Sequence, residues 1–144
     1  MEEKVKVVVI DGQGGKMGCA VISEIKRVIP GQEVYGIGTN SIATAAMLKA
    51  GADYGATGEN PVVVACRDAD VIIGPLGIVI ADSLFGEVTP TMANVIGSSR
   101  AYKLFIPVNR CNHWVAGIQN LSLGEYIRQV VEKLSDWKVE NNVQ

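Results

Sequence analysis

The sequence has few of the residues from which small secreted proteins and metal sites are commonly built. Its three cysteines, Cys19, Cys66 and Cys111, are far apart and lack C-x-x-C spacing. Neither a disulfide framework nor a zinc site is therefore indicated. Histidine occurs once, at His113. These shortages predict a reducing compartment and no metal centre.

Charged residues are also scarce. Asp, Glu, Lys and Arg make up 19% of the chain, the formal net charge is −2, and the basic residues are scattered rather than clustered. This composition gives no electrostatic argument for binding nucleic acid or an anionic membrane. Hydrophobic residues reach 48%. A surface so short of charge favours a homo-oligomer, most simply a homodimer, that buries an apolar face.

Long apolar runs are missing as well. The charged start at 1–4 and the short apolar run after it do not resemble a signal peptide, and no stretch is long enough to span a bilayer. We therefore expect a cytoplasmic protein. The length of 144 residues predicts a single domain over 1–144, because it is too short for a cofactor domain plus a substrate domain. The polar tail, 138–144, is expected to be disordered.

Glycine is concentrated directly after the first apolar run, 5–10. The glycines fail the pattern G-x-G-x-x-G at Met17 but fit G-x-x-G-x-x-G. A glycine turn between a strand and a helix can bind phosphate, because the first N–H groups of the helix are unpaired. A purely structural turn is the alternative. The residues predicted to bind a cofactor here are Gly12, Gln13, Gly14, Gly15, Lys16, Met17 and Gly18.

Each of the three spaced glycines has an expected role. Gly12 allows the sharp turn, Gly15 removes a side chain where backbone approaches a pyrophosphate, and Gly18 lets the helix pack closely on the sheet. The segment 12–18 also resembles the G-A-x-G-R-M-G segment of the dihydrodipicolinate reductases, with Lys16 in place of arginine. In that family the segment holds the pyrophosphate of NADH or NADPH. The resemblance implies the same role here and nothing about chemistry.

Strand and helix patterns alternate along the rest of the chain. Residues 62–64 fit either a helix opened by Asn60 and Pro61 or a strand, and 78–85 are equally ambiguous. Ser41, Thr89 and Ser122 are expected helix caps. Strands are predicted at 5–10, 33–37, 52–56, 70–73, 103–106 and 115–117, and helices at 15–29, 42–50, 90–98 and 123–137.

This alternation predicts an α/β fold: a Rossmann-like, doubly wound parallel sheet in a single three-layer domain. Ligands of such sheets bind above the carboxyl ends of the strands. The second strand ends in Thr39, Asn40 and Ser41, without the acid that commonly holds the ribose of NAD. This slightly favours NADP, although no arginine is nearby. Simple capping of the next helix is the alternative.

Two further loops follow predicted strands. Gly74, Pro75, Leu76 and Gly77 could form a flat wall for the nicotinamide side of the cofactor, or only a tight turn. The second loop is 107–113. Its candidate catalytic residues are Asn109, Arg110 and Cys111.

In that second loop, the positive charge of Arg110 favours the thiolate of Cys111, and Asn109 and Asn112 could orient a carbonyl or phosphate. The alternative is a buried, unreactive cysteine, with His113 packed beside Trp114. Cys19 and Cys66 fall in predicted helices and are expected to pack.

Several motifs together resemble one family along almost the whole chain: V-I-D-G-Q-G-G, G-T-N-S-I-A-T-A-A-M-L-K-A-G-A, G-A-T-G-E-N, D-V-I-I-G-P-L-G-I and P-V-N-R-C-N. They are similar to the bacterial and archaeal family named domain of unknown function 3842. The resemblance implies a short Rossmann-type protein and leaves its activity open.

Three functional hypotheses follow from these motifs. The first is an oxidoreductase-like protein that binds NADP or NAD. The second is a non-catalytic nucleotide or redox sensor, which the absence of a substrate domain favours. The third is a small hydrolase or transferase that uses Cys111.

Overall fold

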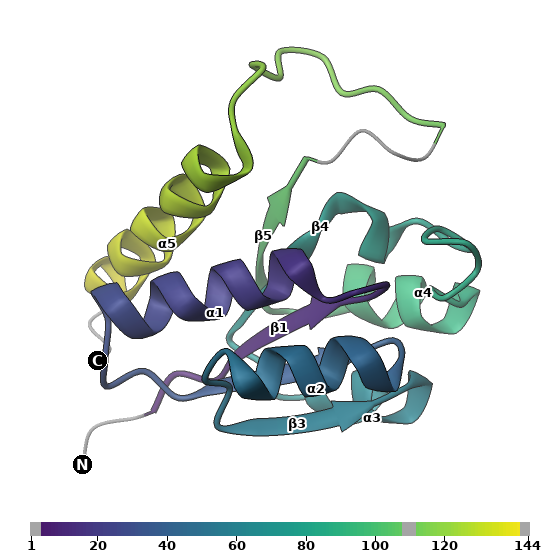
Figure 1. Ribbon diagram of the computed structural model, residues 1–144, viewed down its shortest axis with the longest axis horizontal. Coiled ribbons are helices and arrows are strands. Elements are labelled where there is room, and N and C mark those ends of the chain that lie inside the picture. Colours follow the sequence, from purple (N-terminus) through teal and green to yellow (C-terminus); the bar gives the residue numbers. More distant parts are fainter. Residues whose placement is uncertain (1–3, 108–111, 142–144) are drawn as a thin grey trace.

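The computed structural model describes residues 4–107 and 112–141 (Figure 1). A five-stranded sheet forms the centre, in the order β3-β2-β1-β4-β5 with all neighbours parallel. Its strands are β1 (Val7–Asp11), β2 (Val34–Gly38), β3 (Tyr54–Thr57), β4 (Val71–Pro75) and β5 (Tyr102–Ile106).

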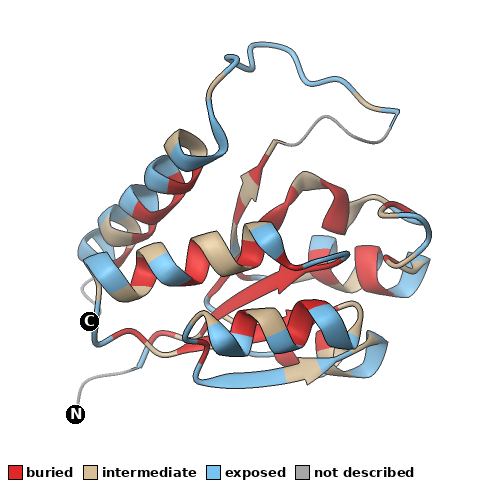
Figure 2. Cartoon of the chain, viewed as in Figure 1, coloured by how far each residue is buried: buried red, intermediate tan, exposed pale blue. Residues whose placement is uncertain are grey.

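Helices cover both faces of this sheet. β1 is buried at every position (Figure 2). Its side chains alternate between two cores, as expected for a parallel strand covered on both sides. One core receives α1, α2 and α5, and the other receives α3 and α4. The helices are α1 (Lys16–Val28), α2 (Ser41–Lys49), α3 (Glu59–Cys66), α4 (Pro90–Ser98) and α5 (Leu123–Glu140), with a 3-10 turn η1 (Leu76–Val79) after β4. The predicted doubly wound, three-layer fold is confirmed.

Of three helix starts compared with the sequence prediction, one agrees and two differ. α4 begins after Thr89, whose hydroxyl accepts from the Met92 N–H, as predicted. α2 is capped by Asn40 rather than Ser41, because the Asn40 side chain accepts from the Ala43 N–H. Residues 59–66 form a helix and no strand, and Gly58 rather than Asn60 is its cap.

The C-terminal part of the chain differs more from the prediction. Residues 115–117 form no strand; they are exposed and lie in the irregular segment between β5 and α5. α5 starts after the predicted cap Ser122, which accepts from the Glu125 N–H. The helix continues to Glu140 instead of fraying after Trp137, so the predicted disorder of 138–140 is wrong. Its last turn is held because buried Lys138 donates to Gln32 Oε1 at 2.5 Å.

The strand order reverses between β1 and β4, since β2 and β3 lie on one side and β5 on the other. At such a reversal the connections leave the carboxyl ends of adjacent strands in opposite directions, which is where open α/β sheets bind ligands. The two connections that start here are the turn from Asp11 to Lys16 and the segment 76–89. In the described part of the chain, no helix is long and apolar enough to cross a bilayer.

Candidate functional site

The glycine turn is anchored from below by Asp11, the last residue of β1. Asp11 is buried, and its carboxylate accepts the Gly12 N–H at 2.8 Å and the Gly18 N–H at 2.7 Å. Burial raises the pKa of Asp11, and the nearby Glu87 charge adds to this rise, while the backbone hydrogen bonds oppose it. The start of α1 is therefore partly satisfied by the protein itself, which the sequence prediction of unpaired N–H groups missed.

Three glycines of the turn are required by packing within the protein. A Cβ on Gly12 would lie 2.4 Å from Thr39 Oγ1, and one on Gly18 would lie 2.7 Å from the sulfur of Met47. Gly15 has a positive φ of 73°, and its Cβ would lie 2.9 Å from the Cα of Ala43. A Cβ on Gly18 would also lie 3.0 Å from the Cβ of Asp11 in β1, which agrees with the predicted close packing of the helix on the sheet. Gly15 is needed for a close approach of α2 rather than for the approach of a ligand.

The tip of the turn is different, because it is open. Gly14 is exposed, has no positive φ, and a Cβ there would meet no atom within 4 Å. Among the described residues, none accepts a hydrogen bond from the N–H groups of Gly14 and Lys16, and Lys16 forms no ion pair. Two backbone donors and one ammonium group are thus available to an anion at this point.

A second carboxylate, that of Glu87, lies over Gly12 and Gln13, on the side of the turn opposite Asp11. Its Oε1 accepts the Gln13 N–H at 2.9 Å, the Thr39 hydroxyl at 2.7 Å and the Asn40 side-chain amide at 2.7 Å. Partial burial raises the pKa of Glu87, but these three hydrogen bonds outweigh it and the net shift is downward. Glu87 is therefore a carboxylate at neutral pH, held at the junction of the glycine turn and the end of β2.

Glu87 is held there by the segment 80–88. The Asp82 N–H donates to Val88 O at 2.7 Å, and the Ser83 hydroxyl donates to Gly77 O. Asp82, Leu84 and Phe85 all have positive φ values, which are costly for residues other than glycine. Leu84 also covers Gly12, since its Cδ1 would lie 2.9 Å from a Cβ there.

No sequence pattern assigns Glu87 to the site. The missing acid at the end of β2 is the one signal in the sequence that points to an acid supplied from elsewhere in the chain. Thr39 and Asn40 of the predicted cluster do lie at the site, where they hold Glu87. Ser41 is exposed at the start of α2.

The loop predicted as a ligand wall is mostly closed by the protein. Gly74 and Pro75 are buried in β4, and a Cβ on Gly74 would lie 2.5 Å from the Ile10 carbonyl oxygen. Gly77 is buried against Ser83, and Leu76 is partly buried. Packing against β1 therefore accounts for Gly74 without a ligand.

The proposed catalytic residues Asn109, Arg110 and Cys111 lie outside the described residues. Next to them, His113 is partly buried, and no described residue is bonded to its Nδ1. Of the other two cysteines, Cys66 is buried, which raises the pKa of its thiol to about 11, and Cys19 is partly buried, so both pack as predicted. Burial, followed by the charge of Asp11, also raises the pKa of Cys19.

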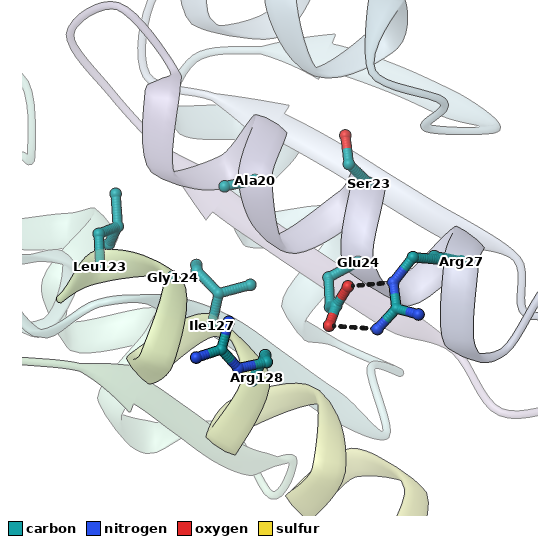
Figure 3. Close-up of a pocket in the computed structure, with 8 residues that line it drawn as sticks. All are labelled: Ala20, Ser23, Glu24, Arg27, Leu123, Gly124, Ile127 and Arg128. Carbon is teal, nitrogen blue, oxygen red and sulfur yellow. Dashed lines mark hydrogen bonds and ion pairs between the residues drawn. The ribbon is translucent and has the colours of Figure 1, made fainter. Parts of the chain in front are cut away.

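Two grooves on the described part of the chain lie away from the glycine turn. One, of about 470 Å³, runs between α1 and α5 (Figure 3). At its side, Arg27 donates a bidentate pair of hydrogen bonds to the carboxylate of Glu24. The other, of about 440 Å³, lies beneath the segment between β5 and α5 and includes Trp114 and Tyr126. In the described part of the chain, no cluster of three or more His, Cys, Asp or Glu side chains could hold a metal ion.

The fold and the turn now allow comparison with known proteins. A family model described as domain of unknown function (DUF3842) matches residues 6–138. The chain belongs to this family. The glycine turn, the end of β2 and the segment 80–88 all fall inside the matched range.

No curated protein matches the chain. Among solved structures it is similar to a dodecameric FMN-dependent Ubix-like decarboxylase from Escherichia coli O157:H7. The identity is 13%, the TM-score is 0.46, and the match covers 90% of this chain and 76% of the other. A similarity of this size is no evidence for a shared ligand, activity or assembly.

Proposed function

We propose that this DUF3842 protein binds a dinucleotide cofactor, NADP or NAD, at the carboxyl edge of its sheet. The diphosphate of the cofactor would lie over the tip of the glycine turn, at the N–H groups of Gly14 and Lys16. A bound nicotinamide would supply hydride transfer, so the protein would be oxidoreductase-like. The chain's own residues would bind and orient the cofactor.

The observation that carries this proposal is the open position at Gly14, in a turn whose other three glycines are packed against the protein. Packing explains Gly12, Gly15 and Gly18 but not Gly14. The N–H groups of Gly14 and Lys16, and the Lys16 ammonium group, have no partner among the described residues. Backbone N–H groups at the start of a helix, together with its positive dipole end, favour phosphate. The position at the reversal of strand order supports the same conclusion.

The two carboxylates limit where an anion fits. Asp11 is directed under the turn, and Glu87 lies over Gly12 and Gln13, so negative charge is disfavoured on that side. A diphosphate therefore fits at Gly14 to Lys16 and not over Gly12.

Thermal unfolding with NAD⁺, NADP⁺, FMN, ATP and S-adenosylmethionine tests the proposal, because a ligand that binds the native state raises the midpoint. We expect one of the two dinucleotides to raise it most. Gly14→Asp places a carboxylate at the open tip without strain and should abolish the rise. Gly31→Asp is the matched control, since Gly31 is also exposed, has no positive φ and has nothing within 4 Å of a Cβ. No shift with any ligand, or the same shift in Gly14→Asp, contradicts the proposal.

We also propose that the chain forms a homo-oligomer. The described segment between β5 and α5 is largely exposed (Figure 2). Among its apolar side chains, Trp114 is 78% exposed, and Val115 and Ile118 are also accessible. Large apolar groups that are exposed together mark surfaces that associate. Light scattering gives the mass of the wild type in solution. A monomer at micromolar concentration contradicts this second proposal.

A further inference from the structure

A dinucleotide-binding sheet usually places an acid at the end of its second strand, where the carboxylate accepts hydrogen bonds from the adenosine ribose. β2 ends in Gly38, and the residues that follow it, Thr39 and Asn40, are neutral. Judged from the sequence around β2, this position has no acid. In the folded protein it has one, because Glu87 reaches it from the segment between η1 and α4.

The position of Glu87 is fixed by groups from both sides of the predicted ribose site. The Gln13 N–H comes from the glycine turn, and the Thr39 hydroxyl and Asn40 amide come from the end of β2. All three donate to the same oxygen, Oε1. The other oxygen, Oε2, accepts no hydrogen bond from any described residue. One oxygen thus holds the side chain in place, while the other is available.

We propose that Glu87 is the specificity-determining residue of the cofactor site, accepting hydrogen bonds from the adenosine ribose hydroxyls and selecting NAD over NADP. This inference rests on the proposed function. A 2′-phosphate would bring negative charge against the carboxylate. No arginine or lysine of the described part is bonded to Glu87, Thr39 or Asn40 to offset that charge. This proposal reverses the slight preference for NADP that the sequence indicates.

The same contacts are compatible with a second role. In that role the Glu87 carboxylate occupies the site of a ligand phosphate, and it must move away before the ligand binds. The position of the turn's remaining donors favours the ribose role, because the open N–H groups lie at Gly14 and Lys16, beyond the residue to which Glu87 is bonded. The two roles predict opposite effects of removing the charge. The direction of the change therefore decides between them.

Glu87→Gln is the variant that separates the roles with the least disturbance. The amide oxygen of glutamine can accept the same three hydrogen bonds, so the segment 80–88 should stay in place. The amide nitrogen then replaces Oε2, so a hydrogen-bond donor takes the place of an acceptor. Glu33→Gln is the control, since it removes the same charge at the opposite end of β2.

The experiment is calorimetric titration of wild type, Glu87→Gln and Glu33→Gln with NAD⁺ and with NADP⁺. We expect the wild type to bind NAD⁺ at least about tenfold more tightly, the size of effect that a charged hydrogen bond gives. Glu87→Gln should weaken NAD⁺ binding by about tenfold and strengthen NADP⁺ binding, while Glu33→Gln changes neither. Urea midpoints of the three proteins check that each is folded.

The outcomes separate the two proposals. If the wild type binds both dinucleotides equally and Glu87→Gln leaves the ratio unchanged, the specificity role is overturned while cofactor binding stands. If Glu87→Gln binds both more tightly, Glu87 is a competitor of the ligand, which also overturns the specificity role. If neither dinucleotide binds to any of the three folded proteins, the proposed function itself is wrong.

Discussion

Two carboxylates meet the same glycine turn from opposite sides, and their surroundings differ. Asp11 lies below the turn, buried, with one backbone N–H on each of its oxygens. Glu87 lies above it, partly buried, with three donors on one oxygen and none from the described residues on the other. Both oxygens of Asp11 accept hydrogen bonds from the protein, so this carboxylate stabilises the fold. Glu87 has one oxygen without a hydrogen bond from a described residue, and this oxygen can accept one from a ligand.

The glycines of the turn show a similar contrast, between a position that the protein fills and one that it leaves open. Gly15 faces α2 and leaves no room for a side chain, while its neighbour Gly14 faces open space. Packing of the protein requires glycine at position 15, whereas glycine at position 14 leaves space that a ligand could occupy. Substitutions at these two positions should therefore differ sharply in their effect on stability.

The largest effect is expected for Gly15→Val. Valine at a φ of 73° is strained, and its Cβ would lie 2.9 Å from the Cα and 3.0 Å from the carbonyl oxygen of Ala43. We expect a loss of about 3 kcal/mol or more in the free energy of unfolding, measured by urea titration. A loss below about 1 kcal/mol would mean that α2 does not pack on the turn as described.

Asp11→Ala should have the next largest effect. It leaves the buried N–H groups of Gly12 and Gly18 without an acceptor, which costs about 1 to 3 kcal/mol for each group, offset in part because a buried charge is also removed. We expect a net loss of about 2 kcal/mol by urea titration. Asp11→Asn keeps one acceptor oxygen and should lose less. Equal stability of Asp11→Ala and wild type would contradict the structural role of Asp11.

A smaller effect, of opposite sign for the two carboxylates, is expected on changing the pH. Burial raises the pKa of Asp11 above 3.8, so its contribution to stability is present below that pH and is lost as the pH rises through the folded-state pKa. The three hydrogen bonds on Glu87 overcome its partial burial and lower its pKa below 4.5, so its contribution is present above that pH and is lost as the pH falls.

These two pH responses can be measured separately by difference. The unfolding free energy of wild type minus that of Asp11→Asn should decrease as the pH rises above about 4, whereas wild type minus Glu87→Gln should decrease as the pH falls below about 4.5. Urea titrations across this range give both differences. Slopes of the same sign would show that the two carboxylates do not have the contrasting surroundings described.

The same contrast explains what the sequence could reveal. The order of strands and helices was predictable because buried strands and caps such as Thr89 and Ser122 are local signals. The glycine turn was predictable for the same reason. Glu87 was not, because it meets Gln13 across 74 residues and is carried by an irregular segment with no periodicity. The last turn of α5 was missed similarly, since Lys138 bonds to Gln32 across 106 residues.

The smallest effect on stability is expected for Gly14→Ala, the counterpart of Gly15→Val at the open position of the turn. Because no atom lies within 4 Å of a Cβ at Gly14 and its φ is not positive, the added methyl group meets no other part of the protein. It also restricts the unfolded chain, so the unfolding free energy should stay within about 0.5 kcal/mol of wild type or rise slightly. Urea titration of both variants gives the comparison directly. If Gly14→Ala is destabilised as strongly as Gly15→Val, the tip of the turn is occupied by the protein itself, and the open position on which cofactor binding depends does not exist.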